Sequence, residues 1–100
     1  MTQVAPVVMT TRGGRRVCDV PAVPGWEGVD KLWRYLELNF AAECVSQVDG
    51  PDARCWTVRV HGATLEIQHE DPWGNMIVSC GPGSDGVLSD IAADLQQRLG

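Results

Sequence analysis

The residues of this chain with the most reactive side chains are two histidines and four cysteines. They are His61, His69, Cys18, Cys44, Cys55 and Cys80. Structural zinc sites usually contain close ligand pairs such as CxxC or HxxxH, because two ligands on one turn lose little conformational entropy when they are fixed. The cysteine separations here are 26, 11 and 25 residues. We therefore expect no metal site.

Thiol catalysis is the second chemistry that these residues suggest. It requires a cysteine beside a histidine that lowers its pKa, together with donors for an oxyanion. No cysteine stands in such a motif, and Cys55, on the polar face of a predicted strand, is the best candidate for a reactive thiol. We expect the cysteines to be reduced, buried and structural, because no export signal is apparent. The neighbouring carboxylates Glu70 and Asp71 lack predicted apolar surroundings that would raise a pKa, so we expect no catalytic residue.

Residues 81–86 match the glycine pattern of dinucleotide-binding loops, with the sequence Gly-Pro-Gly-Ser-Asp-Gly. That fold requires a following parallel strand and an acidic residue about twenty positions further on. The sequence ends at Gly100, directly after the helix predicted to follow the loop. We expect a strand-to-helix turn that uses glycine for its backbone freedom, and no cofactor.

Charge is distributed unevenly along the chain. Residues 1–18 contain three arginines and no acid, a local charge of +3, whereas residues 66–100 contain six acids and one arginine, a local charge of -5. Such asymmetry can steer a protein toward a surface of opposite charge, although chance clustering is the alternative. Six charged residues are therefore candidates for a protein interface: Arg12, Arg15, Arg16, Asp85, Asp90 and Asp94.

Tryptophan supplies the seventh interface candidate. Trp33 and Trp56 fall on predicted core faces, whereas Trp73 occupies the third position of an Asp-Pro-Trp-Gly turn. Turns usually point outward, and an exposed tryptophan is a typical interface anchor. We expect Trp73 to anchor a partner, with folding back over the core as the alternative. Trp26 is expected to pack against the first helix.

Two segments, 29–42 and 84–99, have the apolar spacing of amphipathic helices. Apolar residues stand at offsets 0, 3, 4, 7 and 11 from Val29 in the first segment and from Leu88 in the second. Each apolar stripe must be buried, so each helix needs a partner surface.

The segment 44–80 predicts an antiparallel meander. Apolar and polar residues alternate on both sides of His61 and Gly62, which predicts a hairpin that pairs Val58 with Leu65 on an apolar face. The opposite face of this hairpin is polar.

The sequence of the first 25 residues allows two predictions of their structure. A Gly-Gly pair at 13–14 favours an N-terminal β-hairpin, whereas three prolines favour an extended edge. An exposed edge strand in this region would permit a homodimer by strand pairing, although the prolines argue against a long edge.

Composition limits the class of protein. One hundred residues with 44% hydrophobic and 21% charged side chains fit one globular domain, residues 1–100. The elements predict an α+β two-layer sandwich, with an antiparallel sheet of about four to six strands and two amphipathic helices on one face. The net charge of -5 argues against a nucleic-acid binder. No apolar run of about eighteen residues is present, so we expect no membrane partner and a soluble, cytoplasmic protein.

No motif names an activity. We expect a small, acidic, non-enzymatic protein that acts by binding another protein, as an inhibitor, immunity-type protein, adaptor or chaperone-like module. The amino-acid usage suggests a bacterial source. The alternative is a small-ligand-binding domain or an enzyme that uses Cys55, His61 or His69, or the glycine turn at 81–86.

Overall fold

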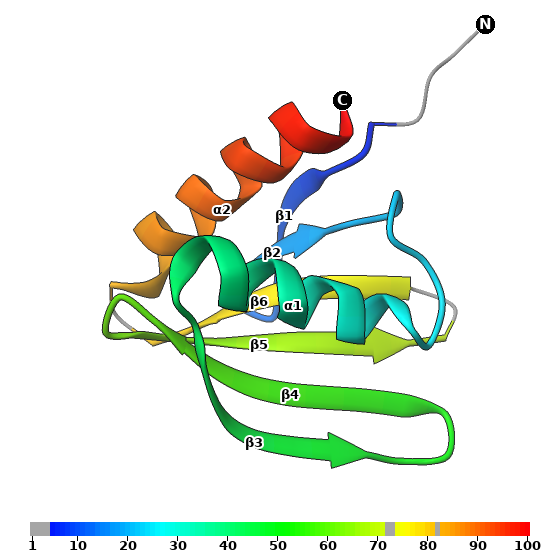
Figure 1. Cartoon of the computed structure of the whole chain (residues 1–100). Helices are drawn as coiled ribbons and strands as arrows, with labels where there is room; N and C mark the ends of the chain where they lie inside the picture. Colours follow the sequence, from blue (N-terminus) through cyan, green and yellow to red (C-terminus); the bar gives the residue numbers. More distant parts are fainter. Residues whose placement is uncertain (1–4, 72–73, 82) are drawn as a thin grey trace, which may run out of the picture.

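The computed structural model describes residues 5–71, 74–81 and 83–100. In this part of the chain the fold is α+β, with one open six-stranded antiparallel sheet and two helices (Figure 1). The elements in chain order are β1 (Val8–Arg12), β2 (Arg15–Asp19), α1 (Gly28–Phe40), β3 (Glu43–Asp49), β4 (Ala53–Val60), β5 (Ala63–Glu70), β6 (Gly74–Cys80) and α2 (Ser84–Leu99). Among the described residues, neither helix has the length and apolar character needed to cross a bilayer.

The strand order is β1-β2-β6-β5-β4-β3, and all neighbouring strands are antiparallel. Short turns join β1 to β2 and connect β3 through β6 in sequence, which is the connection that antiparallel pairing permits. The pairing of β2 with β6 joins segments far apart in the chain, with Cys18 opposite Ile77. The N-terminal hairpin therefore extends the sheet beyond the predicted meander.

The central hairpin has the register that the alternation predicts. His61 and Gly62 adopt left-handed backbone angles, with φ of 49° and 79°, as a tight two-residue hairpin turn requires. Val58 lies opposite Leu65. The predicted register is therefore confirmed. A shift of one residue would have moved every apolar side chain to the other face.

The main buried cluster combines both helices with alternate residues of the sheet. We call the strand face that carries these residues the core face and the opposite one the outer face. The cluster includes Val29, Leu32 and Leu36 of α1, Leu88, Ile91 and Leu95 of α2, and Trp56, Val58, Leu65, Ile67 and Ile77 of the sheet. Burial is confirmed for most of both helical stripes. Trp33 and Phe40 of the first stripe are only partly buried, and Leu99, the last residue of the second, is exposed.

Two predicted boundaries need correction. The first helix covers Gly28–Phe40 rather than 29–42, because Ala41 adopts a left-handed conformation and Ala42 donates its N–H to the Leu36 carbonyl. The meander begins at Glu43 rather than residue 44.

Of the glycine motif, Ser84, Asp85 and Gly86 lie in α2, and Gly81 and Gly83 precede it. Gly81 and Gly83 have φ of 86° and 83°, a region in which glycine avoids the strain that other residues meet. Gly83 precedes Ser84, the first residue of α2. The expectation that glycine serves backbone freedom here agrees with these angles.

Candidate functional site

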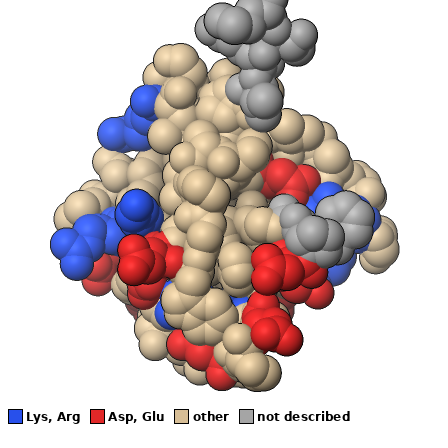
Figure 2. Space-filling model, turned by 90° about the vertical axis from the view of Figure 1, so that its right-hand side faces the viewer, with Lys and Arg blue, Asp and Glu red and all other residues tan. Residues whose placement is uncertain are grey.

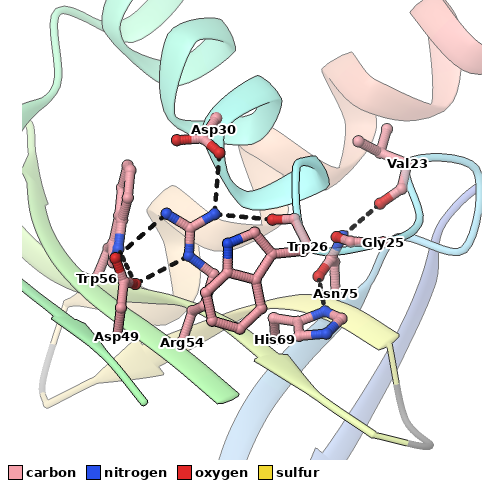
Figure 3. A network of polar contacts seen from close by, with 9 residues as sticks. All are labelled: Val23, Gly25, Trp26, Asp30, Asp49, Arg54, Trp56, His69 and Asn75. Atoms are coloured by element: carbon pink, nitrogen blue, oxygen red, sulfur yellow. Dashed lines mark hydrogen bonds and ion pairs between the residues drawn. The ribbon is translucent and has the colours of Figure 1, made fainter. Parts of the chain in front are cut away.

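Four polar side chains form a row across one end of the core face (Figure 3). Asp49, Arg54, His69 and Asn75 come from β3, β4, β5 and β6, and each is the direct register partner of the next. Side chains alternate between the faces of a strand, so all four lie on the side of the apolar core. Polar groups in such a position require hydrogen-bond partners to offset their loss of water.

Arg54 is the most buried charged residue of this row, with 6% of its surface exposed. Its Nε and Nη2 donate to the two carboxylate oxygens of Asp49 at 2.8 and 3.4 Å. Its Nη1 donates to the carbonyl oxygen of Trp26 at 2.8 Å and to Asp30 at 2.9 Å. The guanidinium carbon also lies 4.7 and 4.6 Å from the ring centroids of Trp26 and Trp56. Arg54 therefore ties the segment before α1, the first turn of α1 and two strands together.

Hydrogen bonds shift the pKa values of the charged groups in this cluster. Burial acts to lower the pKa of Arg54, but the contacts with Asp49 and Asp30 outweigh it, so the pKa is raised. Hydrogen bonds from Arg54, and from the Trp56 indole at 2.9 Å, lower the pKa of Asp49. Both groups stay charged near neutral pH, and the pair stabilises the fold.

Asn75 makes a second tie to the segment before α1. Its amide nitrogen donates to the carbonyl oxygens of Val23 and Gly25 at 2.7 and 2.9 Å. Its Oδ1 lies 2.7 Å from Nδ1 of the buried His69. Since Oδ1 only accepts, Nδ1 of His69 carries the proton. His69 is thus oriented by the same residue that holds residues 23–25.

Arg54 and Asn75 hold the segment before α1, and Trp26 lies exposed in that segment. Its ring makes an edge contact with His69, with centroids 5.8 Å apart and planes at 75°, and it lies against Arg54. The residue is nevertheless 40% exposed. These contacts with the sheet come in addition to the expected packing of Trp26 against the first helix, which stays a prediction. Trp73 lies outside the described residues.

The predicted basic cluster is paired with acids. Arg12 donates to both carboxylate oxygens of Asp19 at 3.1 and 2.8 Å, and Arg15 donates to Glu66 at 3.1 Å. Arg16 is exposed on β2. The local charge of +3 read from the sequence is therefore partly neutralised in space.

The three predicted acids of α2 have different surroundings. Asp94 accepts hydrogen bonds from the Tyr35 hydroxyl at 2.5 Å and from Arg98 at 2.6 Å, and these bonds lower its pKa. Asp85 and Asp90 are exposed. Asp94 thus links α2 to α1, and it is less available to a partner than the other two.

Cys55 and the histidines do not form a thiol–imidazole pair. Cys55 lies opposite Gln68, whereas His69 lies opposite Arg54, so the two side chains point to opposite faces of the sheet. His61 lies at the other end of β5. Burial raises the pKa of Cys55, which disfavours the nucleophilic thiolate.

The four cysteines are free thiols with unequal burial. Cys18 is buried, and burial raises its pKa to about 12. Cys44 is exposed, and Cys55 and Cys80 are half-buried, so the expectation of four buried cysteines is wrong for three of them. Across residues 5–71, 74–81 and 83–100, no group of three potential ligands is placed to hold a metal ion.

The outer face carries two adjoining hollows, of about 430 and 360 Å³, which share Gln68 and Glu70. The larger has an apolar floor and basic side chains at its rim. Its other lining residues are Arg12, Gly13, Arg15, Val17, Met76 and Val78. The smaller extends toward β3 and is also lined by Val48 and Cys55.

Comparison with known proteins adds nothing to this geometry. A scan against protein-family models finds no match to the sequence. Searches of curated proteins and of solved structures also find no match. The interpretation of function therefore rests on the described residues themselves.

Proposed function

We propose that this protein acts by binding another protein, without catalysis, and that Trp26 anchors the partner. One observation carries the proposal: Trp26 is 40% exposed although its ring is held against Arg54 and His69. An indole that is already fixed loses little conformational entropy on binding and buries a large area.

The proposal includes a layered arrangement that leaves binding surfaces free. In it, α1 and α2 both cover the core face as a two-layer sandwich, and the outer face stays open. It is supported by the buried cluster that both helices share with the core face of the sheet. The exposed residues Arg16, Asp85 and Asp90 remain candidates for the rim of an interface.

A capture experiment with matched variants tests the Trp26 anchor. The tagged wild-type chain, Trp26→Ala and Leu38→Ala are incubated with a lysate of the source organism, and bound proteins are quantified by mass spectrometry. Leu38 is the control because it is 75% exposed on α1 and offers no ring held by neighbours. We expect at least one protein to be lost by about tenfold with Trp26→Ala, as for a hot-spot residue, and kept with Leu38→Ala.

The folding of both variants is checked by circular dichroism and thermal unfolding. If every captured protein binds Trp26→Ala as it binds the wild type, the anchor is wrong. If Leu38→Ala loses the same protein equally, the surface is nonspecifically apolar and the assignment of Trp26 also fails.

Small-ligand binding is the second candidate, favoured by the larger outer-face hollow. Its volume of about 430 Å³ falls in the range of small-molecule sites. An anionic ligand there would have to compete with Asp19 for Arg12 and with Glu66 for Arg15. A ligand screen that raises the thermal midpoint of the wild type, but not of Arg15→Ala, would favour this candidate over the first.

A further inference from the structure

We propose that β3 binds an extended basic segment of a partner protein as an added strand of the sheet. This surface differs from the Trp26 anchor, and the inference stands independently of it. β3 is the last strand of the order, pairs with β4, and exposes all seven of its residues. Figure 1 shows it along the edge of the sheet, away from both helices. Alternate backbone groups of an edge strand point outward and can pair with another chain.

β3 carries only part of the protection that is usual for an edge strand. It contains no lysine, arginine or proline. The register shifts between Cys44 and Ser46, so Val45 is an extra residue at the beginning of the strand. Ser46–Asp49 remains regular, and this half is the segment to which we assign strand pairing.

The position of Val48 predicts which side chain of the added strand should lie opposite it. It is 63% exposed and lies on the outer face, where it lines the hollow of about 360 Å³ with Cys55 and Gln68. The partner residue opposite Val48 would point to the same face and contact it, as cross-strand pairs do. An apolar residue suits this position.

The charge around β3 favours a basic partner. Residues 43–52 contain three acids and no base, and Glu70 borders the adjoining hollow. Asp49 is bound to Arg54, so the remaining negative charge comes from Glu43, Asp52 and Glu70. Figure 2 faces the end of the molecule on which the β3–β4 turn lies, and acidic side chains gather in its lower part. A segment rich in lysine or arginine would therefore be attracted to this edge.

The same charges disfavour a second copy of this chain as the occupant. A second copy would bring the same acidic edge against this one, and each chain has a net charge of -5. Repulsion between like charges opposes such a contact. A basic segment of another protein avoids this repulsion.

Peptide binding to the full chain tests the inference. The probe is an acetylated, amidated peptide, Lys-Val-Lys-Val-Lys-Val-Lys, followed by amide hydrogen exchange and by titration with a fluorescent label. We expect new protection of the amides within Ser46–Asp49 that point away from β4, which alternate along the strand. We also expect Val48→Lys to weaken binding at least ~5-fold, because an apolar cross-strand pair is lost and a positive charge is added beside a basic peptide.

Two controls separate strand addition from simple charge attraction. Val8→Lys makes the same change of charge on the opposite edge strand, at a residue that is 40% exposed, and should keep wild-type affinity. A probe with proline in place of its central valine should bind poorly, because proline cannot complete the pairing. Trp26→Ala should bind the probe as the wild type does, so failure of one proposal leaves the other intact.

The inference is wrong if Val8→Lys weakens binding as much as Val48→Lys, or if the proline peptide binds equally well. It is also wrong if protection appears away from β3. A dimer of the chain with β3 protected in the absence of peptide would assign this edge to a second copy instead. Thermal unfolding of Val48→Lys confirms that the exposed substitution preserves the fold.

Discussion

At the scale of single residues, Arg54 is a buried charge held by hydrogen bonds and by contacts with two tryptophan rings. A guanidinium loses water when it is buried, and a buried ion pair stabilises a fold only when its hydrogen bonds are satisfied. Asp49, Asp30 and the Trp26 carbonyl oxygen supply those bonds. The result is a fixed Trp26 at the surface, so a residue inside the fold determines the geometry of the proposed anchor.

Replacing Arg54 should therefore cost much more than replacing a neighbour on the same strand. We expect Arg54→Ala to lower the free energy of unfolding by about 3 kcal/mol, because its partners lose their donor. Arg59→Ala, at an exposed position of β4, should change it by less than about 0.5 kcal/mol. Urea unfolding of both variants measures the difference. Equal effects would contradict a structural role for Arg54.

At the scale of elements, the approach of α1 to β6 sets the position of the segment before the helix. Gly28 begins α1, and a Cβ there would collide with the amide nitrogen of Asn75 and lie 2.6 Å from the Val23 carbonyl oxygen. Glycine is required at this position by close packing rather than by a left-handed backbone. The bonds from Asn75 to residues 23 and 25 depend on that space.

A pair of glycine-to-alanine substitutions tests this approach. Gly28→Ala should lower the free energy of unfolding by about 2 kcal/mol, as overpacking does when a backbone atom blocks the new methyl group. Gly86→Ala in α2 has open space around the new methyl and should raise it by up to about 1 kcal/mol through helix propensity. Thermal unfolding gives both signs. A stabilising Gly28→Ala would exclude the close contact with Asn75.

At the scale of the whole molecule, two ion-paired carboxylates link stability to pH. Asp49 joins β3 to β4, and Asp94 joins α2 to α1 through Tyr35, and hydrogen bonds lower the pKa of both carboxyl groups. The unfolded chain protonates these groups near 3.8, above their folded pKa. Their contribution is fully present above that pH and is lost as the pH falls through the lower folded values.

Acid unfolding should reveal this dependence. We expect Asp49→Asn and Asp94→Asn each to flatten the fall in stability below pH 3.8, relative to the wild type. Asp90→Asn, at an exposed position of α2, is the control and should follow the wild-type profile. Urea midpoints measured across the acid range test the prediction. A profile for Asp49→Asn as steep as that of the wild type would show that Asp49 does not gain from its contacts when folded.

Part of the polar row was already present in the sequence pattern. Arg54 is in phase with Trp56 and Val58, and His69 is in phase with Leu65 and Ile67, so both belong to the core face of the predicted hairpin. The predicted core face was based on the apolar residues of this alternation alone and included neither Arg54 nor His69. Extending the period by one step would have marked both as buried polar groups in need of partners.

The sequence by itself determined the helical stripes, the strand alternation and the turn at His61 and Gly62. These depend on backbone preferences and on side chains within a few residues of each other, which local order makes visible. Only the tertiary structure decided that β2 pairs with β6, that Arg54 meets Asp30 and Trp26, and that acids neutralise the N-terminal arginines. Those contacts join residues far apart in the chain, and their energy depends on how the elements pack rather than on any local pattern.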